Sequence, residues 1–308
     1  MNQIPSHIYH IEGREQGPSF LILGGTHGDE RIGIEVIKLL MQEFGLSEQK
    51  RHVLSDRITG NLYIGFGNPE AIMRHARAAS EGADLNRVFT KQILEDHGAT
   101  HSLDEQRARE LASFLAQMNY VIDVHGTSAP SPRFICFYDN PRRHEILCQP
   151  LNAEFIITDP YNILARDVGK DEHPTLVRYV DQCGGIGIAY EAGWDQDTQN
   201  APLIVEELKR VLIHVGMLHD MIDTNMKRHM PVYALTDCIK AEDALFTYET
   251  GMDHGIKEVS EGDVVGRYGN GELACIPPLK SQALYLFQRD AKRIQKGHAL
   301  YYLATREE

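Results

Sequence analysis

Short apolar runs alternate with longer amphipathic stretches over the first two thirds of the chain. Four runs have the length and hydrophobicity of buried strands: residues 19–23, 61–66, 120–124 and 185–190. Three stretches show helical spacing: residues 30–45, 102–118 and 202–222. Gly45 is placed to end the first helix, and Ser102 with Glu105 forms a capping-box pattern at the start of the second. This alternation predicts an α/β fold with a mostly parallel or mixed sheet flanked by helices.

The pattern changes after about residue 226. From there the chain carries short strand-like runs separated by Gly, Pro, Asp and Asn, and no long helix is indicated. We therefore predict a catalytic α/β domain at 1–225 and a small all-β domain at 226–308.

Composition excludes several classes of partner. The 308 residues carry a formal net charge of −13, which disfavours a nucleic-acid partner but not a small anionic substrate. No apolar run reaches the roughly 18 residues of a membrane span. The five cysteines are scattered without a CxxC pair, and the first residues lack the pattern of a signal peptide. These features predict a cytoplasmic protein and leave room for a homo-oligomer.

Polar residues follow the ends of three predicted strands. His27 and Glu30 come after the first, His125 ends the third, and Glu191 ends the fourth. Because ligands bind beyond the carboxyl ends of strands in open α/β sheets, we expect these side chains to converge. His27 and Glu30 are three residues apart, so they can supply two ligands of a zinc site. His125 is then the natural third ligand, which leaves an open position for water. Asp123 is placed to orient one of these ligands.

Two further groups suggest substrate chemistry. Asn86 and Arg87 stand side by side in "DLNR" and together could hold a carboxylate. Glu191, beside a metal site, could act as general base and then as general acid. Taken alone, Asn86 and Arg87 could simply form a surface turn with a salt bridge, and Glu191 could simply be a strand-end residue in an ion pair. Other histidines, His10 and His52 among them, lie in polar surroundings and are predicted to be surface residues.

The order of these motifs resembles the aspartoacylase / succinylglutamate desuccinylase family, which is related to the zinc carboxypeptidases. The resemblance covers residues 19–200 by motif. It implies that His27, Glu30 and His125 are the ligands of one Zn²⁺ ion, and that Glu191 is the catalytic glutamate. It also implies that Asn86 and Arg87 hold the carboxylate of the substrate.

The same resemblance implies further roles. Asn68 would shape the pocket, and Thr127 would lie in a hydroxyl-rich turn beside it. Arg77 would polarise the scissile carbonyl, with the nearby Arg74 as the alternative. Arg178 would bind a second carboxylate of acidic substrates. In this family the C-terminal β domain narrows the cleft, which favours small acyl-amino acids over peptides.

We therefore predict a zinc-dependent amidohydrolase that cleaves the amide bond of a small N-acyl amino acid. Two alternatives stay open. One is a zinc carboxypeptidase that acts on peptides, and the other is a relative that binds a metal or a small molecule without catalysis.

Overall fold

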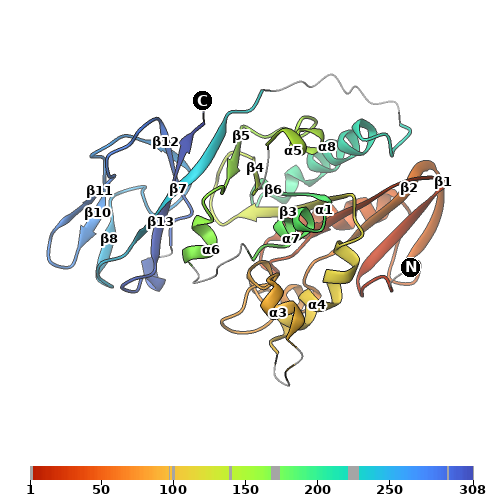
Figure 1. Cartoon of the computed structure of the whole chain (residues 1–308), viewed down its shortest axis with the longest axis horizontal. Coiled ribbons are helices and arrows are strands. Elements are labelled where there is room, and N and C mark those ends of the chain that lie inside the picture. The colour runs from red at the N-terminus through yellow and green to blue at the C-terminus, as the bar shows by residue number, and fades with distance from the viewer. Residues whose placement is uncertain are drawn as a thin grey trace.

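The chain folds around a ten-stranded mixed sheet with helices on both faces (Figure 1). The structure is a computed structural model that describes residues 3–96, 98, 101–138, 141–167, 174–220, 229–289 and 291–307. Its strands are β1 (Ile8–Gly24), β2 (His52–Phe66), β3 (Tyr120–Thr127), β4 (Phe134–Phe137), β5 (Phe155–Thr158), β6 (Ile186–Trp194), β7 (Val232–Lys240), β8 (Phe246–Tyr248), β9 (Lys257–Val259), β10 (Val264–Tyr268), β11 (Leu273–Cys275), β12 (Ala283–Leu286) and β13 (Ala299–Arg306). Its helices are α1 (Arg31–Glu43), α2 (Pro69–Arg74), α3 (Lys91–Glu95), α4 (Leu103–Leu115), α5 (Pro141–Cys148), α6 (Ile163–Asp167), α7 (Leu176–Gln182) and α8 (Ala201–His214), with 3₁₀ turns η1 (Leu85–Arg87), η2 (Thr198–Asn200) and η3 (Ala291–Arg293).

The strand order in the large sheet is β2-β1-β3-β6-β4-β5-β7-β13-β12-β9. The pairs β1–β3 and β3–β6 are parallel, whereas β4 runs antiparallel to β6. The predicted mixed α/β fold is therefore confirmed. The C-terminal strands β7, β13, β12 and β9 continue the same sheet, and β11, β10 and β8 form a separate small one. The predicted domain boundary at 225/226 lies outside the described residues.

Two cores form because neighbouring residues of a strand face opposite sides of the sheet. In β1, Phe20 and Ile22 join the core beneath α1 and α8, whereas Leu21 and Leu23 join the core beneath α4 and α7. A third apolar cluster lies among the C-terminal strands. Figure 1 shows these strands at the opposite end of the molecule from β1 and β2.

Several local predictions hold and others do not. Ser102 and Glu105 form the expected capping box on α4, and Gly45 follows α1 with a φ of 66°. The predicted helix at 202–222 is too long, because α8 ends at His214. The first strand is longer than predicted, since β1 begins at Ile8. The short elements β4, β5 and α5 to α7 were not predicted.

Within the described part of the chain, no helix combines the length and the hydrophobicity needed to cross a membrane. The cytoplasmic location stays a prediction.

The guanidinium of Arg107, on α4, holds the end of β2 in place. Arg107 is only 7% exposed, and it donates to the carbonyl oxygens of Gly67 at 2.8 Å, Phe66 at 2.9 Å and Ser6 at 3.0 Å. It also pairs with Glu110 at 2.6 Å. One side chain thus donates to three backbone carbonyls and pairs with one carboxylate.

Replacing Arg107 by Met should lower the free energy of unfolding by about 3–5 kcal/mol. The change leaves buried carbonyls without donors, each at a cost of about 1–3 kcal/mol, and removes a partly buried charge pair. The matched control is Arg14→Met, whose ion pair with Asp56 is exposed and should contribute about 0–1 kcal/mol. Urea unfolding of the variants measures both values, and equal losses would contradict this role of Arg107.

Candidate functional site

A tight turn between β1 and α1 carries His27 and Glu30. Gly25 in this turn has a φ of 66°, a conformation that suits glycine. A Cβ atom on Gly28 would lie 2.0 Å from the carbonyl carbon of Ala71, so only glycine lets the turn pack this closely against α2. Glu30 is the residue before α1, and its side chain makes no capping bond to the helix. Its carboxylate is therefore free to point toward the histidines.

The Glu30 carboxylate lies between two imidazoles. Oε1 is 2.6 Å from His27 Nδ1, and Oε2 is 2.9 Å from His125 Nδ1. The backbone N–H of Gly126 donates to Oε2 at 3.0 Å. All three side chains are nearly inaccessible, with 4%, 8% and 2% exposure for His27, Glu30 and His125. Residues almost a hundred positions apart are thereby brought into contact.

Each of the two imidazoles also contacts a carboxylate of its own through the ring nitrogen that faces away from Glu30. His27 Nε2 is 3.1 Å from Asp84 Oδ1, and His125 Nε2 is 2.9 Å from Asp123 Oδ2. Asp123 also accepts a hydrogen bond from Thr26 Oγ1 at 2.8 Å. With both Nε2 atoms held in this way, both Nδ1 atoms face the same Glu30 carboxylate. Asp123 therefore makes the contact expected of an orienting group, whereas Asp84 was missed although it opens the "DLNR" motif.

The charges in this cluster shift the protonation of its members. Burial alone would raise the pKa of Glu30, but His27 and His125 outweigh burial and hold that pKa well below its usual range. Burial opposes the charged form of His125, yet Asp123 and Glu30 raise its pKa well above the ordinary value. The same two imidazoles and one carboxylate that stabilise each other's charges here could instead surround a cation.

The donor set fits a metal ion of the zinc type. His27, Glu30 and His125 each offer one ligand atom, and these atoms all lie within 4.8 Å of one another. Two imidazole nitrogens and one carboxylate are a ligand set of catalytic zinc sites, which keep a fourth position open. The outer carboxylates on both imidazoles are the groups that usually orient such ligands.

Glu191 lies beside this cluster on the neighbouring strand. It is the register partner of His125 across β3–β6 and of Phe134 across β4–β6. Burial raises the pKa of Glu191, the charge of Glu30 adds to this, and His125 opposes it, with a resulting value of about 7. A carboxyl group with this pKa can both accept and return a proton near neutral pH.

Arg77, the arginine predicted to polarise the scissile carbonyl, lies beside this cluster. Its Nε donates to Asp84 Oδ2 at 3.0 Å, and its Nη1 is 3.7 Å from Glu30 Oε1. Arg77 lines the cavity, whereas Arg74, in the last turn of α2, is not among the described residues that line it. The geometry therefore favours Arg77 over Arg74 as the arginine that faces the cluster of His27, Glu30 and His125.

Asn86, Arg87 and Thr127 line the same cavity. The side-chain oxygen of Asn86 accepts from the backbone N–H of Leu176 at 2.9 Å, which fixes the orientation of this amide. Arg87 donates from Nη1 to the backbone carbonyl oxygen of Asn86 at 2.8 Å. Thr127 Oγ1 donates to the carbonyl oxygen of Ala129 at 2.7 Å.

Two predicted pocket residues lie elsewhere. Asn68 is buried at the start of α2, where it accepts from Ala71 N–H at 3.3 Å and donates to Asp104 at 2.9 Å. It thus has a structural contact as a helix cap. Arg178 lies on α7 and, like Asn68, is not among the described residues that line the cavity.

The cavity has a volume of about 590 Å³, and many apolar side chains line it away from His27, Glu30 and His125. The N-terminal part of this apolar wall includes Phe134, Cys136, Ile157, Leu164 and Ala189. The C-terminal part supplies Leu235, Ile256, Phe287, Ala299 and Tyr302, together with the polar Asp253, His254, Gln288 and Arg289. These residues were not predicted to line a pocket. They lie on short strands and loops, where the pattern of apolar and polar residues does not distinguish a pocket wall from an ordinary core.

Comparison with known proteins places this geometry in a family. Residues 16–209, more than half of the chain, match the model of the succinylglutamate desuccinylase/aspartoacylase catalytic domain. The chain belongs to the succinylglutamate desuccinylase/aspartoacylase family. The family predicted from the motif order is therefore confirmed.

Relatives within this family share only part of their length with the chain. A probable aspartoacylase of Acaryochloris marina is 34% identical over 113 residues, which is 35% of this chain and 35% of that protein. The N-acyl-aromatic-L-amino acid amidohydrolase (carboxylate-forming) of Xenopus laevis is 31% identical over 164 residues, or 51% of this chain and 50% of that protein. The chain thus matches about a third to a half of the length of these curated relatives.

Solved structures of the family share the fold over nearly the whole chain. The succinylglutamate desuccinylase/aspartoacylase of Rhodobacter sphaeroides superposes with a TM-score of 0.70 at 17% identity, covering 98% of this chain and 88% of that one. Murine aminoacylase 3 gives a TM-score of 0.70 at 16% identity, covering 96% and 97%. The likeness includes the C-terminal strands as well as the matched catalytic region.

Proposed function

We propose that this protein is a zinc-dependent hydrolase that cleaves the amide bond of a small N-acyl amino acid. The observation that carries the proposal is the Glu30 carboxylate between the Nδ1 atoms of two buried histidines, with Glu191 on the adjacent strand. Membership of the family supports the same reaction, since its named relatives are amidohydrolases. His27, Glu30 and His125 would hold one Zn²⁺ ion.

The residues around this site have complementary roles in the proposed reaction. Zinc, when bound, supplies a Lewis acid that polarises the scissile carbonyl and acidifies water. Glu191 takes the proton from the attacking water and returns it to the leaving amine, which balances the hydrolysis. Arg77 stabilises the oxyanion, and Asn86 and Arg87 hold the carboxylate of the amino acid.

The apolar wall indicates which substrates the cavity accepts. A second carboxylate would need a cation on that wall. Arg178, predicted for this role, is not among the described residues that line the cavity, and Arg289, which does line it, donates from Nε to the carbonyl oxygen of Ala299 at 2.6 Å. The aromatic rings of Phe134, Phe287 and Tyr302 lie together there, with Phe287 6.3 Å from Phe134 and 6.1 Å from Tyr302 between ring centroids. We propose that a substrate with one large apolar group fits best, in keeping with the name of the Xenopus relatives.

Both alternatives from the sequence are less well supported. A peptide would have to extend past the loops at 253–256 and 287–289, which border the cavity. A binding protein without catalysis would have no use for a carboxyl group with a pKa of about 7 beside the metal ligands. Assays with an acetylated amino acid, a tripeptide and a chelator distinguish the three.

Changing Glu191 to Gln should lower kcat by about 10²–10⁴-fold, because the general base is lost while the metal ligands remain. Zinc content, measured by mass spectrometry of the metal, should stay at the wild-type value. The matched control is Glu154→Gln, an exposed position that should keep full activity. Wild-type turnover in the Glu191 variant would remove this residue from the mechanism.

Changing Asp84 or Asp123 to Asn should each weaken zinc binding about 10–100-fold, because each carboxylate orients one imidazole. Competition with a chromogenic chelator measures this loss. Asp56→Asn, on the exposed surface, is the control and should bind zinc as tightly as wild type. If both variants matched that control, the outer carboxylates would have no role in holding the ligands.

N-acetyl-L-phenylalanine should be hydrolysed with a kcat/KM at least about tenfold above that of N-acetyl-L-aspartate, because only the former gains from the apolar wall. Phe287→Ala should reduce this ratio, mainly by lowering kcat/KM for N-acetyl-L-phenylalanine. A preference for the aspartate derivative would contradict the assignment of the wall, and Arg289 would then be the cation to test.

A further inference from the structure

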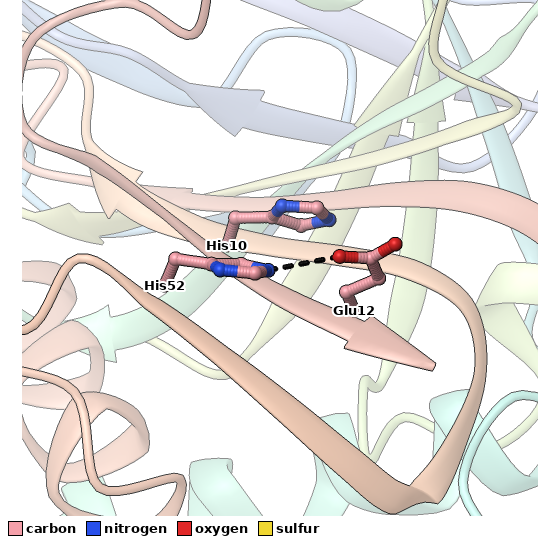
Figure 2. A group of neighbouring side chains, drawn as sticks. All are labelled: His10, Glu12 and His52. Carbon is pink, nitrogen blue, oxygen red and sulfur yellow. Dashed lines mark hydrogen bonds and ion pairs between the residues drawn. The ribbon is translucent and has the colours of Figure 1, made fainter. Parts of the chain in front are cut away.

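A second cluster of metal-binding side chains lies on β1 and β2, away from the cavity. His10, Glu12 and His52 each offer one ligand atom, and these atoms all lie within 4.8 Å of one another. Figure 2 shows the two imidazoles one above the other, with the Glu12 carboxylate at the same end of both rings. The family match gives this cluster no role, and none of its residues lines the catalytic cavity within the described part of the chain.

The register of the sheet explains why these side chains meet. The first part of β1 lies between two stretches of β2, so that His10 pairs with His52 on one side and with Tyr63 on the other. One row further along, Glu12 pairs with Asn61. Cross-strand partners and residues two apart on a strand share one face of a sheet. The cluster is therefore held by backbone pairing rather than by a chance meeting of long side chains.

His10 is the fixed member of the cluster. It was predicted to be a surface residue, but it is only 7% exposed because its ring stacks between its neighbours. The ring centroid lies 4.6 Å from that of Tyr63 and 4.9 Å from that of His52, and Phe114 of α4 packs edge-on against Tyr63. This packing leaves His10 little freedom to turn.

The other members face solvent and can adjust. The side chains of His52 and Glu12 are 51% and 45% exposed, and His52 Nε2 lies 3.0 Å from Glu12 Oε2. His10 Nε2 lies 2.8 Å from Asn61 Oδ1, so an amide oxygen lies beside the ring nitrogen of His10. One side of the cluster is thus rigid, and the other is open for an ion to enter.

We propose that His10, Glu12 and His52 form a second divalent-metal site that binds Zn²⁺, with the Asn61 oxygen as a fourth ligand. Two imidazoles with carboxylate and amide oxygens, and no thiolate, suit zinc and similar transition ions. The ion replaces the direct contacts His52–Glu12 and His10–Asn61, and small rotations of the exposed side chains bring the donors to bonding distance. Because the ligands come from both strands, the ion joins β1 to β2 at the edge of the sheet.

Metal stoichiometry tests this site independently of catalysis. The 308-residue chain is stripped with a chelator, dialysed and titrated with Zn²⁺, or with Co²⁺ to follow the visible absorption of the bound ion. Wild type should bind two equivalents. His52→Asn should bind one and keep its hydrolytic activity, and Glu12→Gln should weaken the same equivalent about tenfold or more. His219→Asn, an exposed histidine outside both clusters, should still bind two.

A catalytic-site variant keeps the two metal assignments distinguishable. His125→Ala should retain one equivalent, and this equivalent should disappear when His52→Asn is added. A single wild-type equivalent that His125→Ala abolishes would overturn the second site. A single equivalent that His52→Asn abolishes would leave this proposal standing and contradict the catalytic zinc. Circular dichroism of each variant checks that the fold is retained.

Discussion

The contact of one carboxylate with two buried imidazoles is the interaction on which the site depends. Glu30 can meet His27 and His125 only if the turn after β1 lies against the end of β3, and the parallel pairing of these strands provides this position. Buried charges are tolerated only when they are paired and hydrogen-bonded. The site therefore needs Asp84, Asp123 and the Gly126 backbone as much as its three central members.

The sheet also explains how the general-base candidate comes to be in place. Glu191 is the register partner of His125, so a single strand pairing sets the two side by side. The next residue back, Tyr190, faces the opposite core, where its hydroxyl donates to Glu207 of α8 at 2.6 Å. The strand that presents the carboxyl group is thus anchored on the face away from the cavity. The carboxyl ends of the parallel strands carry the ionisable side chains of the site, while the C-terminal strands and loops form much of one wall of the cavity.

Much of this could be predicted from the sequence because hydrophobic runs and strand-end residues carry a local signal. The strand before His125 and the glycine turn before His27 are examples, and both belong to elements of the expected type. The choice between Arg77 and Arg74 could not be made in that way, since it depends on the contact with Asp84 across a loop. The position of Asn68 shows a similar limit, because a residue before proline has the same sequence pattern whether it only caps a helix or also borders a pocket. The four-residue strands β4 and β5 are too short for periodicity to identify.

Anomalous scattering at the zinc edge, from crystals of the His52→Asn variant grown with zinc, tests the central claim most directly. This variant removes the proposed second site and leaves the first intact. The account predicts a strong peak about 2.0–2.2 Å from the Nδ1 atoms of His27 and His125 and from a Glu30 oxygen. Density that keeps the direct Glu30–imidazole contacts at saturating zinc, with no peak between them, would contradict it.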